Sequence, residues 1–203
     1  MPTITSLKQQ NKKERFNVFI DGEFAFSVSI DAVIKYRLKE GLLLSNTQIQ
    51  EITQEEEKNY AFSLGLKYIN KAFKTKKQVK TYLISKEISY NSVKFAIEKL
   101  TDLGYLNDVE YAKQYIETYS NSQGKRMVDY KLMMKGVNKE DIESAYTSIE
   151  IPSKENAKLI AEKRLKNKEI NRENILKTYR YIVSKGFSFE EAEYAVKEFK
   201  EQL

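Results

Sequence analysis

Clustered lysine and arginine side chains are the groups in this sequence best suited to do chemistry, and the chemistry that suits them is phosphate binding. Residues 58–100 contain ten lysines against two glutamates, and residues 154–185 contain ten lysines and arginines against four glutamates. Such clusters attract a nucleic-acid backbone because binding releases its counterions, without reading base sequence. A lysine-rich, solvated helical surface explains the same composition without any ligand, and both interpretations stay open.

Two sets of cations recur at equivalent places in successive predicted helices. The first set occupies first turns, where the helix dipole disfavours positive charge, so an external phosphate explains it better than folding does. Its members are Lys76, Lys77, Lys125 and Arg126. The second set lies at helix ends, where the dipole favours cations, so folding and phosphate contact explain it equally well. Its members are Lys86, Lys135 and Lys185. Glutamine in place of the first set should leave stability unchanged or slightly raised.

The composition argues against an enzyme. The chain has no cysteine and no histidine, so it lacks a thiol nucleophile, the usual general base and the commonest metal ligands. Carboxylate groups around Glu140 and Glu190 lie at predicted helix starts, where they complement the helix dipole. Gly124-Lys125 lacks the upstream glycine and the following Ser or Thr of a phosphate-binding loop. We therefore predict no catalytic residue, no metal and no cofactor.

A repeat of about fifty residues must position the cations. One short pattern occurs three times, as Leu83-x-x-Lys86-Glu87-Ile88, Leu132-x-x-Lys135-Gly136-Val137 and Ile182-x-x-Lys185-Gly186-Phe187. A small helical unit of this kind cannot bury its apolar face alone and stacks on its neighbours. The predicted fold is mainly α, with three tandem three-helix repeats in an elongated curved array and a small N-terminal β-hairpin extension. Leu83, Leu132 and Ile182 should be equivalent core positions.

Cap residues and apolar spacing predict three helices in each repeat. The predicted ranges are 57–73, 76–86 and 91–102, then 108–120, 125–135 and 139–148, then 153–166, 172–185 and 189–201. The acidic run Glu55 to Glu57 predicts a break in the preceding helix or in its burial. Gly136 and Gly186 suit a left-handed helix end, whereas Glu87 predicts a closure that is strained or of another type. Pro152 predicts a hinge of limited freedom.

The first 45 residues do not share the repeat. Alternating runs at 15–20 and 23–28 flank Asp21-Gly22, the strongest local signal for a hairpin turn. Because two strands are marginal in water, residues 4–10 could add a third. Ser29 or Asp31 should cap a helix to about residue 39. The predicted organisation is 1–45 as a β-hairpin plus helix extension, 46–105 as a linker helix and first repeat, 106–150 as the second repeat, and 151–203 as the third.

The segment Gly104-Tyr105-Leu106-Asn107-Asp108-Val109-Glu110-Tyr111-Ala112 resembles the signature Gly-Tyr-(Leu/Ile)-(Asp/Asn)-Asp-x-x-(Phe/Tyr)-Ala of RecX, the bacterial family that regulates the RecA recombinase. Gly124-x-x-x-Val128-x-x-x-Leu132-x-x-Lys135-Gly136-Val137 is similar to the segment that follows the signature in that family. The resemblance implies three three-helix repeats and a non-catalytic, negative modulator that binds the RecA nucleoprotein filament. It further implies limited filament growth, ATP hydrolysis and strand exchange. The seven cations above, selected by their positions in the predicted helices, are the expected contacts with DNA or the filament.

Two other functional classes stay open. One is a general nucleic-acid-binding helical repeat that acts without a recombinase, and the other is a protein-interaction scaffold that binds no DNA. Helix-turn-helix readers usually carry Arg, Asn or Gln on a recognition helix, and the predicted third helices carry few of them. We therefore expect weak binding to single- and double-stranded DNA without sequence preference. The sequence contains no stretch of roughly 20 apolar residues, which predicts a cytoplasmic protein without membrane contact. We expect a monomer.

Overall fold

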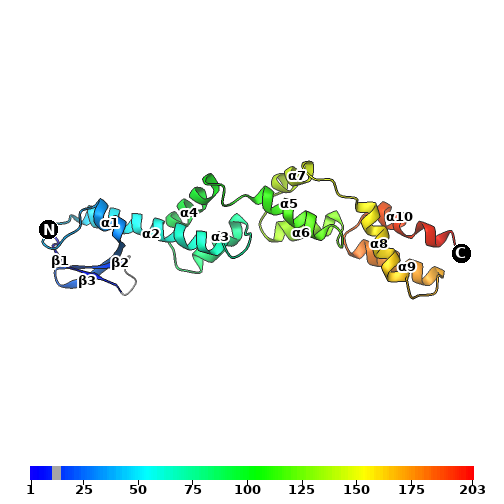
Figure 1. Cartoon of the computed structure of the whole chain (residues 1–203), viewed down its shortest axis with the longest axis horizontal. Helices are drawn as coiled ribbons and strands as arrows, with labels where there is room; N and C mark the ends of the chain where they lie inside the picture. The colour runs from blue at the N-terminus through cyan, green and yellow to red at the C-terminus, as the bar shows by residue number, and fades with distance from the viewer. Residues whose placement is uncertain (11–14) are drawn as a thin grey trace. The chain divides into compact units, whose positions relative to one another are not determined.

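The computed structural model describes residues 1–10 and 15–203, and shows a small N-terminal sheet followed by helices (Figure 1). The elements are β1 (Ile4–Gln9), β2 (Arg15–Ile20), β3 (Glu23–Ser29), α1 (Ile30–Lys35), α2 (Asn46–Ile69), α3 (Lys76–Ile84), α4 (Tyr90–Asp102), α5 (Asp108–Tyr119), α6 (Lys125–Met134), α7 (Lys139–Thr147), α8 (Ser153–Leu165), α9 (Arg172–Ser184) and α10 (Phe189–Lys200). The predicted mainly helical fold with an N-terminal sheet is confirmed. One compact unit comprises Met1–Ala72 and Val79–Tyr105, and the other comprises Phe73–Gln78 and Leu106–Leu203.

The N-terminal sheet is an antiparallel meander in the order β1-β2-β3. Asp21 and Gly22 take φ values of 50° and 91°, as a two-residue turn between twisted strands requires, so the predicted hairpin is confirmed. β1 supplies the third strand. One face of the sheet packs into a core with the residues that follow it. The buried members of this core are Ile4, Val18, Phe26, Val28, Ala32, Leu38, Leu44 and Ile52.

The helix after the sheet is shorter than predicted. Ser29 caps α1 by accepting the backbone N–H of Ala32, but the helix ends at Lys35 rather than near residue 39. Arg37 adopts a left-handed φ of 50° there, and the chain then turns Leu38 into the core. Burial of one leucine therefore overrides continued helical propensity.

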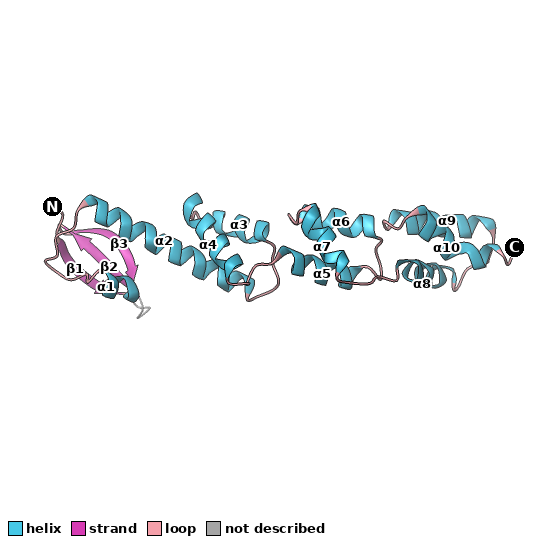
Figure 2. Cartoon of the chain, turned by 90° about the horizontal axis from the view of Figure 1, so that it is seen from above, coloured by secondary structure: helices cyan, strands magenta, loops and turns pink. Residues whose placement is uncertain are grey.

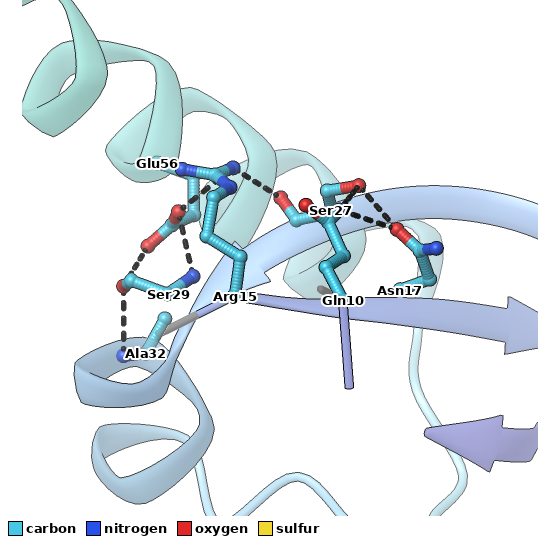
Figure 3. Close-up of polar contacts among 7 residues, drawn as sticks. All are labelled: Gln10, Arg15, Asn17, Ser27, Ser29, Ala32 and Glu56. Carbon is cyan, nitrogen blue, oxygen red and sulfur yellow. Dashed lines mark hydrogen bonds and ion pairs between the residues drawn. The ribbon is translucent and has the colours of Figure 1, made fainter. Parts of the chain in front are cut away.

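The predicted break at Glu55 to Glu57 is wrong, because α2 runs without interruption through all three residues and extends from the sheet to α4 (Figure 2). Glu56 is only 6% exposed and accepts hydrogen bonds from the backbone N–H of Ser29 at 2.9 Å and from its hydroxyl at 2.5 Å. Arg15 of β2 lies 3.6 Å from the same carboxylate (Figure 3). A buried charge with these partners holds α2 against the sheet.

The two neighbouring glutamates contact different elements. Glu55 binds Lys35 and Tyr36, and their hydrogen bonds lower the pKa of its carboxyl. Glu57 accepts the backbone N–H of Ser89 at 3.0 Å and the hydroxyl of Ser92 at 2.6 Å, at the start of α4. Burial opposes this ionisation, yet the hydrogen bonds lower the pKa of Glu57. The acidic run thus ties one helix to the N-terminal core and to the first repeat.

Each repeat is a group of three helices. Leu83, Leu132 and Ile182 have no exposed surface, which confirms that they are equivalent core positions. Asn107, Asn138, Asn171 and Ser188 provide N-caps through their side chains, whereas Gly124 caps α6 without one. The buried cores of the second and third repeats are Ala112, Ile116, Val128, Leu132, Val137, Ile142 and Ala145, and Ala157, Ala161, Ile175, Ile182, Phe187, Ala192, Ala195 and Val196.

All three second helices end in the same backbone conformation. We call the lysine and the residue after it a corner: Lys86-Glu87, Lys135-Gly136 and Lys185-Gly186. The φ values of Glu87, Gly136 and Gly186 are 60°, 92° and 95°. The backbone N–H after the corner then bonds back into the helix, from Ile88 to Leu83 O and from Val137 to Leu132 O. Glu87 therefore makes the same left-handed closure, and the strained alternative is correct.

Candidate nucleic-acid interface

The first-turn cation Lys125 has partners within its own repeat. Its ammonium lies 2.9 Å from the carboxylate of Asp129 and 3.7 Å from the centre of the Tyr146 ring. Asp129 also accepts a hydrogen bond from the Tyr146 hydroxyl at 2.9 Å. Burial and that hydrogen bond raise the pKa of Tyr146. Part of the reason for Lys125 at a helix start is thus a local ion pair and cation–π contact.

Arg126 contacts the helix end of the following repeat. Its guanidinium donates to Val183 O at 3.2 Å, and its backbone N–H donates to Gly186 O at 3.3 Å. The N–H of Gly124 donates to Lys185 O at 3.0 Å. The carbonyl end of α9 carries a partial negative charge, which a cation complements. Folding therefore does supply a reason for Arg126, contrary to the premise from which this cation was selected.

The start of α3 makes an equivalent joint with the corner of the second repeat, and all residues of this joint belong to the second compact unit. The buried hydroxyl of Thr75 donates to Lys135 O at 2.7 Å. A Cβ added to Gly136 would lie 2.3 to 2.8 Å from the side-chain carbons of Lys77, so the stem of Lys77 covers the corner. The N–H of Lys76 donates to the carboxylate of Asp108 at 2.9 Å.

The structure therefore divides the seven predicted contact residues into three groups. Lys76 and Lys77 lie beside the corner that contains Lys135, and Lys125 and Arg126 lie beside the corner that contains Lys185. Lys86 belongs to the other compact unit. These joints were not predicted from the sequence. The recurring Lys-Gly dipeptide was the available signal, since a glycine is needed both for a positive φ and for close approach.

The recurring corner lysines share a second feature, which is an aromatic partner. The ammonium groups of Lys86, Lys135 and Lys185 lie 5.7, 5.6 and 5.2 Å from the ring centres of Tyr82, Tyr115 and Tyr181. Within the described residues none of these lysines makes an ion pair with a carboxylate. Each repeat thus presents an uncompensated cation beside an aromatic ring, a combination suited to a phosphate next to a base.

The first repeat carries a further basic and aromatic cluster that the sequence analysis did not select. Lys99 lies 4.6 Å from the ring centre of Phe62 and 5.5 Å from that of Phe95, and Lys58 lies 5.7 Å from the latter. All four side chains come from α2 and α4. The local charge excess was visible in the sequence, but the pairing of two helices around shared rings was not.

Known proteins resemble this chain in both sequence and fold. Family models described as "Regulatory protein RecX N-terminal domain" and "RecX, second three-helix domain" match residues 2–45 and 107–145. The protein named "Regulatory protein RecX" from Clostridium acetobutylicum is 36% identical over 137 residues, which is 67% of this chain and 64% of that protein. This chain belongs to the RecX family.

Further RecX proteins give a consistent result. The one from Bacillus subtilis is 35% identical over 69% of this chain and 54% of its own length. The matches span 54 to 64% of the length of these two relatives. A crystal structure of regulatory protein RecX matches with a TM-score of 0.76 and 26% identity, covering 97% of this chain and all of that one. RecX from Lactobacillus salivarius, at 24% identity and a TM-score of 0.66 over 72% of this chain, shares the fold.

The RecX signature has a structural explanation in this chain. Gly104 takes a φ of 75° after α4, Leu106 is buried, and Asn107 caps α5 by accepting two backbone N–H groups. Asp108 is buried and accepts the N–H of Lys76, and desolvation raises the pKa of its carboxyl. Ala112 lies in the core. Gly104, Leu106, Asn107, Asp108 and Ala112 of the signature thus have roles in the fold.

In residues 1–10 and 15–203, no group of three or more His, Cys, Asp or Glu side chains is placed to hold a metal ion. No helix among these residues is long and apolar enough to cross a membrane.

Proposed function

We propose that this protein is a non-catalytic, negative modulator of the RecA recombinase that binds the RecA–DNA filament and limits its growth, ATP hydrolysis and strand exchange. The observation that carries the proposal is the match of nearly the whole chain to regulatory protein RecX. Such a role in DNA recombination and repair places a monomeric protein in the cytoplasm. It needs no cofactor, because the protein acts by occupying the filament and performs no reaction.

The electrostatic surface supports the nucleic-acid half of this proposal. Corner lysines without carboxylate partners recur once per repeat, each beside a tyrosine ring. Counterion release makes such cations attractive to any phosphate backbone, so binding should be weak, independent of sequence and strongly dependent on salt. We assign contact with DNA or the filament first to Lys86, Lys135 and Lys185. Lys76 and Lys77 follow, and then Lys125 and Arg126, which also have intramolecular partners.

The decisive experiment measures ATP hydrolysis by RecA filaments on single-stranded DNA as the protein is added. The proposal predicts inhibition, together with co-sedimentation of the protein with the filaments. Bare single- and double-stranded oligonucleotides, followed by fluorescence polarization, provide controls. Equal binding to bare DNA without any effect on RecA would favour the general nucleic-acid-binding class. Binding to neither would favour a protein scaffold and would contradict the proposal.

A charge-matched pair of variants tests the site. Replacing Lys86, Lys135 and Lys185 with Gln should weaken DNA binding about tenfold or more at low salt and lower the salt slope by about three units, one per lost phosphate contact. The control replaces three exposed lysines that make no ring contact or ion pair within the described residues: Lys139, Lys168 and Lys197. Equal losses in the two triple variants would contradict the assignment to the corners and leave the regulatory role intact.

A further inference from the structure

The third repeat contains a basic hollow outside the contacts described so far. It has a volume of about 380 Å³ and lies between α8, α9 and the loop that follows α5. Its lining is Asn121, Ser122, Ile160, Lys163, Arg164, Tyr181 and Lys185. Among the hydrogen bonds that join the second and third repeats are one from Gly124 N–H to Lys185 O at 3.0 Å and one from the Asn156 amide to Ser120 O at 3.0 Å.

The charge of this hollow is uncompensated. Three of its seven lining residues are cations and none is a carboxylate. Within the described residues, Lys163, Arg164 and Lys185 make no ion pair. The guanidinium of Arg164 lies 4.1 Å and the ammonium of Lys185 lies 5.2 Å from the centre of the Tyr181 ring. The cations are thus held in place by an aromatic ring while their charge stays available to a ligand.

Arg164 provides the second observation. Its Nε atom is buried, and no acceptor from the described residues reaches it. The rest of the Arg164 side chain is partly exposed, and its charge has no carboxylate partner within the described residues. The planar fork of a guanidinium also matches the oxygens of a phosphate in a bidentate geometry.

The other repeats do not carry a guanidinium at this position. Ala61, Ala112 and Ala157 are equivalent buried residues of the first helices, and seven residues further on stand Tyr68, Tyr119 and Arg164. Tyr68 stacks on Tyr82 with ring centres 4.1 Å apart, in the place where Arg164 covers Tyr181. An arginine in the third copy thus takes the place that an uncharged aromatic ring fills in the first copy.

We infer that the hollow formed by Lys163, Arg164 and Lys185 binds a phosphate group of a nucleic-acid strand. A single-stranded or double-stranded backbone supplies this phosphodiester equally well. The small volume suits a phosphate and its sugar better than a folded acidic segment of a protein. Five of the seven lining residues, including all three cations, lie within the second basic stretch of the chain. This inference deepens the proposed function and rests on the part of it that concerns DNA binding. The third repeat would then contact a nucleic-acid strand directly.

The test uses the full chain and a fluorescein-labelled oligothymidylate, followed by polarization at several salt concentrations. Arg164→Gln should weaken binding about tenfold at low salt and reduce the salt slope by about one unit. Arg164→Lys keeps the charge but loses the planar guanidinium, so its affinity for the oligonucleotide should lie between those of the wild type and Arg164→Gln. Lys168→Gln is the control, since Lys168 is exposed, lies in the same repeat and does not line the hollow. Thermal melts should show at most a small loss of stability in Arg164→Gln, because the change removes only the contact of the guanidinium with the Tyr181 ring.

The outcomes separate this inference from the proposed function. If the wild-type chain binds the oligonucleotide and Arg164→Gln behaves like Lys168→Gln, the phosphate site is wrong and the regulatory role stands. If the wild-type chain does not bind it, both the site and the nucleic-acid half of the proposed function are overturned. Polyglutamate tests the remaining ligand class, because loss of its binding in Arg164→Gln, with oligothymidylate binding retained, would assign the hollow to an acidic protein segment. Should Arg164→Gln be unstable, Lys185→Gln probes the same hollow with the same expected loss.

Discussion

The corner of the first repeat and those of the later repeats share one backbone conformation but have different surroundings. Glu87 is exposed, whereas Gly186 is buried against α6 and Gly136 is partly covered by Lys77. A left-handed residue costs about 1 kcal/mol or more when it is not glycine, which an isolated corner tolerates. A corner that receives a neighbouring helix has no room for a side chain at all. Among the three corners, glycine therefore occurs at the two that form joints, and a non-glycine residue occurs at the one that is exposed.

Gly186→Ala should have the largest effect on this comparison. The new Cβ would lie 2.5 Å from the backbone nitrogen of Met127, so steric overlap adds to the backbone strain. We expect a loss of about 3 kcal/mol in the free energy of unfolding, measured in urea. Gly104→Ala is the control, because its φ is 75° but its Cβ would meet nothing within 4 Å. It should cost only about 1 kcal/mol. Equal losses in the two variants would mean that close approach at the joint does not matter.

Arg126→Gln should weaken the second joint by a smaller amount. It removes the hydrogen bond to Val183 O and the cation at the carbonyl end of α9. We expect a loss of about 1 kcal/mol at low salt that shrinks as salt is added. This reverses the expectation from the sequence that glutamine at the first-turn cations leaves stability unchanged. A midpoint matching that of Lys168→Gln in thermal melts at low salt would restore the original expectation.

Glu87→Gly should stabilise the protein, the opposite sign to Gly186→Ala. The substitution relieves the left-handed strain, and the greater entropy of glycine in the unfolded chain offsets part of the gain. A net increase of about 0.5 kcal/mol in the free energy of unfolding is expected. A decrease would indicate that the Glu87 side chain contributes a contact that outweighs the strain.

Asp108→Asn should give the smallest effect, and a pH-dependent one. Burial raises the pKa of the Asp108 carboxyl in the folded state. Between the unfolded and the folded pKa, the folded protein therefore keeps a proton on Asp108 that the unfolded chain has released. Its stabilisation is therefore complete below the unfolded pKa of about 4 and is lost as pH rises through the folded pKa. Asparagine still accepts the N–H of Lys76 without this penalty. Urea unfolding should show a relative gain for the variant that grows with rising pH and then levels off. A pH-independent difference would contradict the assignment.

The sequence predicts the local parts of this fold well, because caps, turn residues and apolar spacing act over a few residues. Asp21-Gly22 and the equivalence of Leu83 with Ile182 are examples. Contacts between residues that are distant in the sequence could not be predicted in this way. Thr75 meets Lys135 across 60 positions, and Glu56 meets Ser29 across 27, so neither the first joint nor the unbroken α2 could be read from a local pattern.

The candidate site follows the same division. The recurrence of Lys86, Lys135 and Lys185 is visible in the sequence, and their freedom from carboxylates agrees with a role in binding. The ring beside Lys135 belongs to a different helix, and the acceptor for Arg126 belongs to a different repeat. A cation at a helix start is therefore not a sufficient sign of a phosphate contact. Arg126 lies at the start of α6, but its guanidinium interacts with the carbonyl end of α9.

The two joints have a consequence for how such a chain can change in length. The second repeat carries both halves of a joint, since its corner receives the start of α3 and its own Gly124 to Met127 segment receives the next corner. Each of the outer repeats supplies only one half to these joints. A tandem duplication of the middle copy would therefore regenerate a complementary contact at every new boundary. Insertion of an extra middle copy would thus preserve the contacts between repeats. Exchanging the order of the copies would separate each corner from its partner.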